Sequence, residues 1–337
     1  MIDSFRRTGL FILAVFFTAV VCTSCSVFRD SSGGSNATGN AVEGSAEAGN
    51  AEAGNADAGG SASLGVVVTF DALYELAVAI GGERARVSNI MPPGADAHHF
   101  EPGARDLGLL STADVLLICG LGFEPWVQNA VTAAANDKLV MCDVSLGIEP
   151  IGVEEHEGSH EHGYYDPHIW LSPACAVIIA ENIRDTFIQV DPDGAEYYSR
   201  NYDEFSGALN RLLEEYSGKF KDLVNRTIVT GHAVFAYLCR DFGLVQNSIE
   251  GVFEEGEPSA RALADLIDFC RSESITAILT ESLSSPLVAE TLAAEAGADV
   301  IVIYTMESAE EGLTYIARME HNLSVIYDVL CNCESQS

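Results

Sequence analysis

The chain has 337 residues and a formal net charge of -33 at pH 7. So strong a negative charge argues against a protein that binds nucleic acid or anionic lipid surfaces, because both are themselves negative. It is compatible with attraction of cations, but an acidic surface that only keeps the protein soluble would have the same composition.

The first 24 residues have the layout of a secretory signal. Arg6 and Arg7 form a basic flank, and a largely apolar run from Gly9 to Cys22 follows, too short for a comfortable membrane span. The run closes at Cys22-Thr23-Ser24-Cys25, which resembles the lipobox of bacterial lipoproteins and implies that Cys25 is the lipid-bearing first residue of the mature chain. Cys22 stands where that motif usually has Leu, so an ordinary signal peptidase cut or an uncleaved anchor remains an alternative.

A low-complexity segment follows at residues 25–63. It is rich in Ser, Gly, Asn, Ala and Glu and contains the near-repeat AEAGN-AEAGN-ADAGG. Such a segment cannot bury enough apolar surface to fold, so we predict a disordered tether. The residues from 64 onward suit two small lobes better than one core.

Short β-rich runs alternate with helical segments in two series. The runs are VVVTF, RVSNI, VLLICG and KLVMCDV in the first series, and TIVTG, LVQNSI, TAILTE and DVIVIY in the second. Alternation of this kind predicts parallel βαβ units. We therefore expect an α/β protein with two Rossmann-like lobes, at 64–190 and 225–333, each a mostly parallel sheet flanked by helices.

A long helix is predicted between the lobes, over residues 191–224. Apolar residues recur there in steps of three and four, which mark one face of a continuous helix. They are Tyr198, Tyr202, Phe205, Leu209, Leu213, Tyr216, Phe220 and Leu223. A helix of about 30 residues is roughly 45 Å long, so this one would be a rigid connector between the lobes.

Three histidines stand beside predicted strand ends or helix starts, where ligands collect in open α/β sheets. His98 lies in a Pro- and Gly-bounded loop, although loop histidines are often merely solvated. His168 follows Asp166-Pro167 in a stiff loop, but its ring could simply pack near Trp170. His232 is expected at the head of a helix, where the helix dipole favours the neutral, metal-binding imidazole; a buried His bonded to backbone would have the same sequence.

Two further features could contribute metal ligands. Glu307, after the last predicted strand, could complete a four-ligand shell, or could be an ordinary solvated Glu. His156, His160 and His162 lie in EEHEGSHEHG, whose composition fits weak, mobile metal contacts or a featureless polar loop.

The cysteines beyond the anchor do not form a recognisable framework. They are Cys119, Cys142, Cys175, Cys239, Cys270, Cys331 and Cys333. Their number is odd and they include no CxxC pair, so the sequence predicts neither a disulfide framework nor a structural zinc site. Most lie in apolar runs, where we expect them to be buried as small hydrophobic residues.

Taken together, these segments resemble the metal-binding lipoproteins of zinc and manganese ABC importers, the cluster A-I solute-binding proteins. The resemblance is carried by the stretch from Ile90 to Trp126, by DPHIWLSP, by GHAVFAYLCRDFGL and by IEGVFEEGEPSA. It implies that His98, His168 and His232 are metal ligands with Glu307 as the fourth, and that the metal lies between two lobes.

The chain departs from the family pattern in two places. Ala97 replaces the usual Pro in the first loop, and the stretch around Glu307 is a looser match. Glu281, at the end of TAILTE, or a water molecule is therefore an alternative fourth ligand.

The ligand set favours zinc. Three imidazoles with one carboxylate suit tetrahedral Zn²⁺, whereas Mn²⁺ favours more oxygen, and an acidic residue takes the place of His232 in manganese-type relatives. We predict a non-enzymatic, monomeric protein that captures Zn²⁺ outside the cytoplasm, anchored through Cys25, and delivers it to an ABC importer permease. The alternatives are a manganese-type protein of the same family, a secreted zinc-dependent hydrolase, although the chain has no HExxH, and an adhesin or storage lipoprotein with the same site.

Overall fold

The computed structural model describes residues 63–95, 100–153, 164–252, 259–281, 287–310 and 312–336. All of them belong to one compact unit, Asp57–Ser337, and none to the unit Met1–Ala56. The predicted signal, the anchor Cys25 and the tether up to residue 62 therefore lie outside the described residues. Within the part of the chain that is described, no helix is long and apolar enough to cross a membrane.

The N-terminal lobe contains a four-stranded parallel sheet with the strand order β2-β1-β3-β4. Its strands are β1 (Leu64–Val68), β2 (Ala85–Asn89), β3 (Val115–Ile118) and β4 (Val140–Asp143). The central strands β1 and β3 are apolar and buried throughout, as expected for parallel strands that are covered on both faces.

Helices cover both faces of this sheet. They are α1 (Asp71–Gly81), α2 (Ala104–Leu110), α3 (Val127–Ala134) and α4 (Pro173–Val190). Because successive strand residues point to opposite faces, Val66 and Val68 pack in the core cluster that contains residues of α1 and α4, whereas Val67 packs with Leu110 of α2 and Ala130 of α3.

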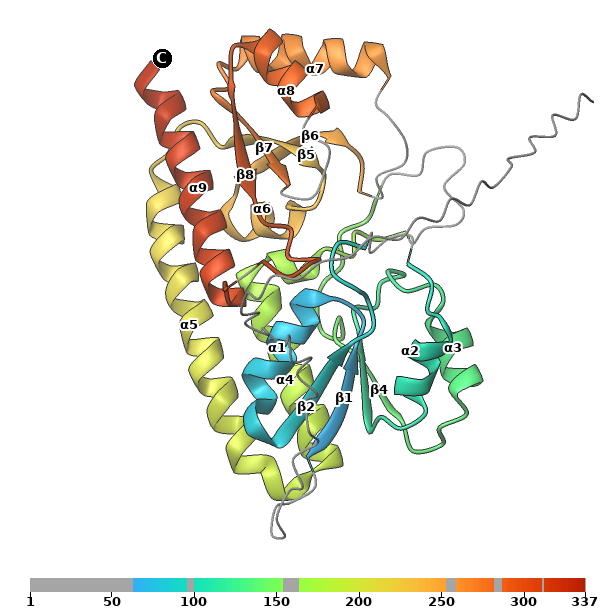
Figure 1. The fold of residues 1–337 in the computed structure, drawn as a ribbon. Coiled ribbons are helices and arrows are strands. Elements are labelled where there is room, and N and C mark those ends of the chain that lie inside the picture. Colours follow the sequence, from blue (N-terminus) through green and yellow to red (C-terminus); the bar gives the residue numbers. More distant parts are fainter. Residues whose placement is uncertain are drawn as a thin grey trace, which may run out of the picture. The chain divides into compact units, whose positions relative to one another are not determined.

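The C-terminal lobe repeats this arrangement with the strand order β6-β5-β7-β8, again parallel (Figure 1). Its elements are β5 (Thr227–His232), α6 (Ala236–Phe242), β6 (Val245–Glu250), α7 (Ala260–Ser272), β7 (Ala277–Glu281), α8 (Leu287–Ala296), β8 (Asp299–Ile303) and α9 (Tyr315–Gln336). Val229 and Ile278 pack with residues of α7 and α8, whereas Ile228 and Leu279 belong to the large core cluster that includes α6 and α9. Both sheets are parallel and flanked by helices, so the predicted fold class is confirmed.

One long helix, α5 (Ala195–Lys221), packs against both lobes (Figure 1). It contacts α1 and α4 of the first lobe and α6 and α9 of the second. Its buried residues include Tyr198, Phe205, Leu209 and Tyr216, which belong to the periodic apolar face of the sequence. At 1.5 Å per residue, its 27 residues extend for about 40 Å.

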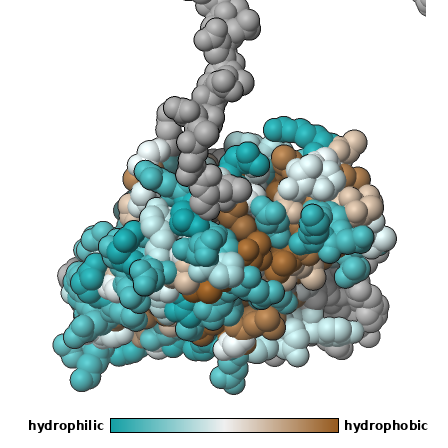
Figure 2. Space-filling view, turned by 90° about the horizontal axis from the view of Figure 1, so that it is seen from below, coloured by the Kyte–Doolittle hydropathy of each residue, from teal (hydrophilic) through white to brown (hydrophobic). Residues whose placement is uncertain are grey.

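Most cysteines are buried, as their apolar surroundings predict. Cys119, Cys142, Cys175, Cys239 and Cys270 are buried free thiols, and Cys331 is a half-buried one. The side chain of Cys333 lies outside the described residues. The face of the molecule in Figure 2 is largely hydrophilic, with a narrower apolar band among the polar residues. A mixed surface of this kind is normal for a folded domain.

Candidate metal-binding site

Three side chains from distant parts of the sequence meet in one cluster. His168, His232 and Glu307 each offer a ligand atom, and these atoms lie within 4.8 Å of one another. The two imidazole rings are nearly perpendicular, with their centroids 5.1 Å apart. Zinc–nitrogen and zinc–oxygen bonds of about 2.0–2.2 Å place neighbouring tetrahedral ligands about 3.4 Å apart, so the three groups need to move by about an ångström to share one ion.

The sequence around His168 fixes the position of its ring. Ile169–Leu171 form a 3-10 turn, and the Ser172 hydroxyl then accepts a hydrogen bond from the Cys175 N–H and caps α4. The imidazole is fully buried, and its centroid is 5.1 Å from that of Trp170. The His168 ring therefore packs near Trp170 and also belongs to the cluster with His232 and Glu307.

Asp166 orients this imidazole. One of its carboxylate oxygens accepts hydrogen bonds from the backbone N–H of His168 at 2.9 Å and from Nδ1 of the same residue at 2.8 Å. The acceptor assigns the proton to Nδ1, which leaves the lone pair of Nε2 for a cation. Burial raises the pKa of Asp166 to about 7, although the hydrogen bond from His168 and the nearby His232 lower it.

We did not predict this role of Asp166 from the sequence, where Pro167 accounted for the local geometry. The two-residue spacing in Asp-Pro-His is the signal that could have indicated it, since a carboxylate can accept from the backbone N–H and from Nδ1 of the residue two positions further along the chain.

The expected position of His232 at the head of a helix is wrong. His232 is the last residue of β5, and α6 begins only at Ala236. The carbonyl of His232 accepts hydrogen bonds from the Thr230 hydroxyl at 2.7 Å and from the Gln246 amide at 2.9 Å. These side chains hold the strand end in place, so the helix dipole is not what favours the neutral ring.

Two oxygen-bearing neighbours face the His232 ring instead. Its Nε2 donates to the carbonyl of Val252 at 2.9 Å, and its Nδ1 lies 3.7 Å from a carboxylate oxygen of Glu281. The ring nitrogen that keeps its lone pair is then Nδ1. Of the two candidate acidic ligands, Glu307 belongs to the cluster with both histidines. Glu281, at the end of β7, lies near His232.

The remaining predicted ligands, His98, His156, His160 and His162, lie outside the described residues. Their flanking residues are described. Gly94, four positions before His98, donates its N–H to the hydroxyl of Ser308, next to Glu307, at 3.2 Å. The residues that flank 154–163 lie side by side, because Val153 N–H donates to the Tyr164 carbonyl at 3.1 Å and Asp166 N–H to the Ile151 carbonyl at 2.9 Å.

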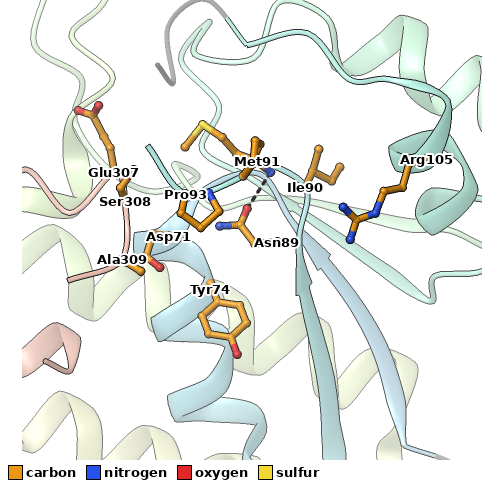
Figure 3. A pocket seen from close by; sticks show the side chains of 11 residues that line it. Asp71, Tyr74, Asn89, Ile90, Met91, Pro93, Arg105, Glu307, Ser308 and Ala309 are labelled. Carbon is orange, nitrogen blue, oxygen red and sulfur yellow. Dashed lines mark hydrogen bonds between the residues drawn. The ribbon is translucent and has the colours of Figure 1, made fainter. Parts of the chain in front are cut away.

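A pocket of about 310 Å³ borders the cluster. Met91 and Pro93 from the base of the first loop line it together with Asp71, Arg105 and Glu307. Figure 3 shows Glu307 at one end of this pocket and Arg105 at the other, with the Glu307 carboxylate pointing away from the arginine.

Two parallel α/β lobes joined by one long helix, with imidazole and carboxylate groups from both lobes in one cluster, are the arrangement of a solute-binding protein for a metal ion. The family model of the zinc-uptake complex component A, periplasmic, matches residues 66–329. The chain belongs to this family, and the resemblance seen in the sequence is confirmed.

Proteins of similar sequence have names that refer to metal binding or zinc uptake. A Treponema pallidum protein named for metal binding is 41% identical over 272 residues, which are 78% of this chain and 86% of the relative. The high-affinity zinc uptake protein ZnuA of Bacillus subtilis is 35% identical over 279 residues, 79% of this chain and 88% of the relative. The zinc-binding lipoprotein AdcA of Streptococcus pneumoniae is 32% identical over 276 residues, and the match spans only 55% of its length.

Solved structures show the same fold. A crystal structure of ZnuA has a TM-score of 0.71 and 31% identity, over 80% of this chain and 99% of that one. The laminin-binding protein Lmb of Streptococcus agalactiae, described as a bifunctional adhesin and metal transporter, has a TM-score of 0.73 and 30% identity over 80% of this chain and 100% of that one. A manganese-bound periplasmic protein of Candidatus Liberibacter asiaticus has a TM-score of 0.70 and 26% identity, over 79% and 98% of the two chains.

Proposed function

We propose that this protein captures Zn²⁺ outside the cytoplasm and delivers it to the permease of an ABC importer. The ion is bound by His168, His232 and Glu307, with His98 as the fourth ligand. The observation that carries the proposal is the convergence of two buried imidazoles and one carboxylate, with their ligand atoms within 4.8 Å of one another. Membership in the zinc-uptake family supports the same conclusion.

The donor set determines the preferred ion. Imidazole nitrogen suits Zn²⁺, and three imidazoles with one carboxylate fill a tetrahedral shell and leave no open position for a reacting water. Mn²⁺ prefers more oxygen donors. The manganese-bound relative makes Mn²⁺ the chief alternative, and Glu281 beside His232 is the group that could add oxygen to the shell.

A direct experiment tests the identity of the metal. The protein is analysed for its elements as isolated and then titrated with zinc and manganese against a chromophoric chelator. We expect one zinc per chain and a clear preference for zinc. The proposal would be overturned by one manganese per chain, or by a protein that binds neither metal more tightly than the chelator does.

A lipid anchor would keep the protein near a membrane partner. We propose that Cys25 carries the lipid anchor, as the lipobox-like sequence indicates, and that the protein acts as a monomer. Labelling of growing cells with a palmitate analogue tests the anchor: the native chain should take up the label and Cys25→Ser should not. Zinc uptake in cells that lack the gene tests the delivery.

The other functions considered from the sequence receive less support. The relatives named above have binding, uptake and adhesion names rather than enzyme names, which agrees with the expectation that the chain is not an enzyme. Zinc-dependent cleavage of a peptide or ester by the pure protein would revive the hydrolase alternative. Adhesion, as described for Lmb, is compatible with zinc binding and would appear as attachment to laminin.

A further inference from the structure

The segment that carries Glu307 is held from outside at four of its five carbonyl groups. This segment, Tyr304–Ser308, connects β8 to the turn before α9. The carbonyls of Tyr304, Thr305, Glu307 and Ser308 accept, in that order, from Asn322 Nδ2 at 2.7 Å, Trp170 Nε1 at 2.8 Å, the Asp71 N–H at 3.3 Å and Arg318 Nη1 at 3.1 Å. Two of these donors belong to the first lobe and two to α9, so the segment is fixed between the lobes.

The backbone of this segment is also strained. Met306, directly before Glu307, is a buried non-glycine residue with a φ of 61°, in the left-handed region. Such a conformation persists only where the surrounding contacts determine it, and strain of this kind is concentrated at functional sites. The external hydrogen bonds are those contacts, so they set the direction in which the Glu307 side chain leaves the backbone.

The guanidinium of Arg318 adds a further link between this segment and the first lobe. Arg318 is fully buried; its Nη1 donates to the Ser308 carbonyl, and its Nη2 lies 2.8 Å from a carboxylate oxygen of Asp71. Asp71 is the first residue of α1, and its own N–H donates to the Glu307 carbonyl. Neither of these buried charges is solvated by water, so removing one would leave the other buried and unpaired at a large cost in free energy.

We infer that Arg318 and Asp71 are positioning residues for metal capture, which fix the Glu307 carboxylate relative to His168 and His232 without touching the ion themselves. The inference rests on the proposed function, since it takes Glu307 as a ligand. It goes beyond that function because it makes zinc affinity depend on a buried ion pair between α9 and α1. A pair that only stabilised the fold would affect unfolding and leave the affinity of the folded protein unchanged.

The experiment is a double-mutant cycle on zinc affinity. Arg318→Met and Asp71→Asn are prepared alone and in the Glu307→Gln background, and folding is verified by circular dichroism. Each single variant should weaken zinc by about tenfold or more, the range for residues that orient metal ligands. In the Glu307→Gln background the same substitutions should change the affinity by less than about threefold, because the carboxylate that they position is gone.

A second Arg–Asp ion pair, which is less deeply buried, supplies the control. Arg84 and Asp191 lie 2.7 Å apart and are joined by several hydrogen bonds, but they connect the 3-10 turn after α1 to the end of α4. Arg84→Met and Asp191→Asn should lower the melting temperature and leave zinc affinity within about threefold of the native value, since distant sites act independently.

The outcomes separate this inference from the proposed function. An unchanged affinity in Glu307→Gln would remove that residue as a ligand, and the proposed ligand set would fail with it. If Glu307→Gln weakens zinc but Arg318→Met and Asp71→Asn do not, or if their losses multiply in full in the double variants, only the positioning role is refuted. Should Arg318→Met fail to fold, Asp71→Asn, which keeps the size of the side chain, decides the same comparison.

Discussion

The hydrogen bonds from Asp166 make His168 a ligand of defined orientation, and removing them should weaken zinc capture in graded steps. Asp166→Asn keeps an oxygen that can accept from Nδ1 of His168 but removes the negative charge. Asp166→Ala removes the acceptor of two buried donors, the backbone N–H and the Nδ1–H of His168. We therefore expect the order of zinc affinity to be native, then Asn, then Ala.

The contacts of Asp166 indicate how large these losses of zinc affinity should be. The native carboxylate accepts from both the backbone N–H and Nδ1 of His168, at 2.9 and 2.8 Å, and it is almost fully buried. Loss of a partner that orients a metal-bound imidazole typically costs about 10–100-fold in metal affinity. We expect a loss of about tenfold for Asp166→Asn and one nearer a hundredfold for Asp166→Ala, or about 1.4 and 2.7 kcal/mol of binding free energy.

The assay is a zinc competition titration at fixed pH and ionic strength, with thermal melts in a chelator to measure the metal-free fold. Asp143→Asn is the matched control, because Asp143 also accepts from the N–H two residues on, that of Ser145, at 3.0 Å. Its second partner is a serine hydroxyl rather than an imidazole. Equal losses for Asp143→Asn and Asp166→Asn, or a native affinity in Asp166→Ala, would show that orientation of the His168 ring does not control binding.

Three further predictions concern stability. Burial raises the pKa of Glu124 from 4.5 to about 7, so the folded state holds this proton more tightly, and the free energy of unfolding should fall by up to about 3 kcal/mol as pH rises from about 4.5 to about 7. Glu124→Gln should flatten that part of a urea-unfolding profile, and an unaltered profile would contradict the assignment. Tyr237→Phe removes hydrogen bonds to the Asp166 carbonyl and from the Ile151 N–H, and should cost about 1–3 kcal/mol in the same unfolding assay. Zinc at a hundred times its dissociation constant should stabilise the protein by about 2.7 kcal/mol, an effect that a chelator should abolish and that Glu307→Gln should reduce at the same zinc concentration.

The amino-acid sequence determined the elements and the family. Runs such as VVVTF and VLLICG alternate with helical segments, and this alternation predicted parallel strands between helices. The apolar period in α5 and the Asp-Pro-His motif are also local patterns, and each was visible without knowledge of the fold. Local patterns report local geometry, and here they also identified the histidines worth considering.

Tertiary structure decided how these residues act together. His232 ends a strand because Thr230 and Gln246 bind its carbonyl, and Gln246 comes from a neighbouring strand. Glu307 lies beside His168 and His232 in a segment whose carbonyls accept from Trp170, Asp71 and Arg318, and Trp170 is 135 residues away from its acceptor, Thr305. Contacts over such separations depend on how two sheets and a long helix pack, and no period or motif in one stretch of sequence encodes them.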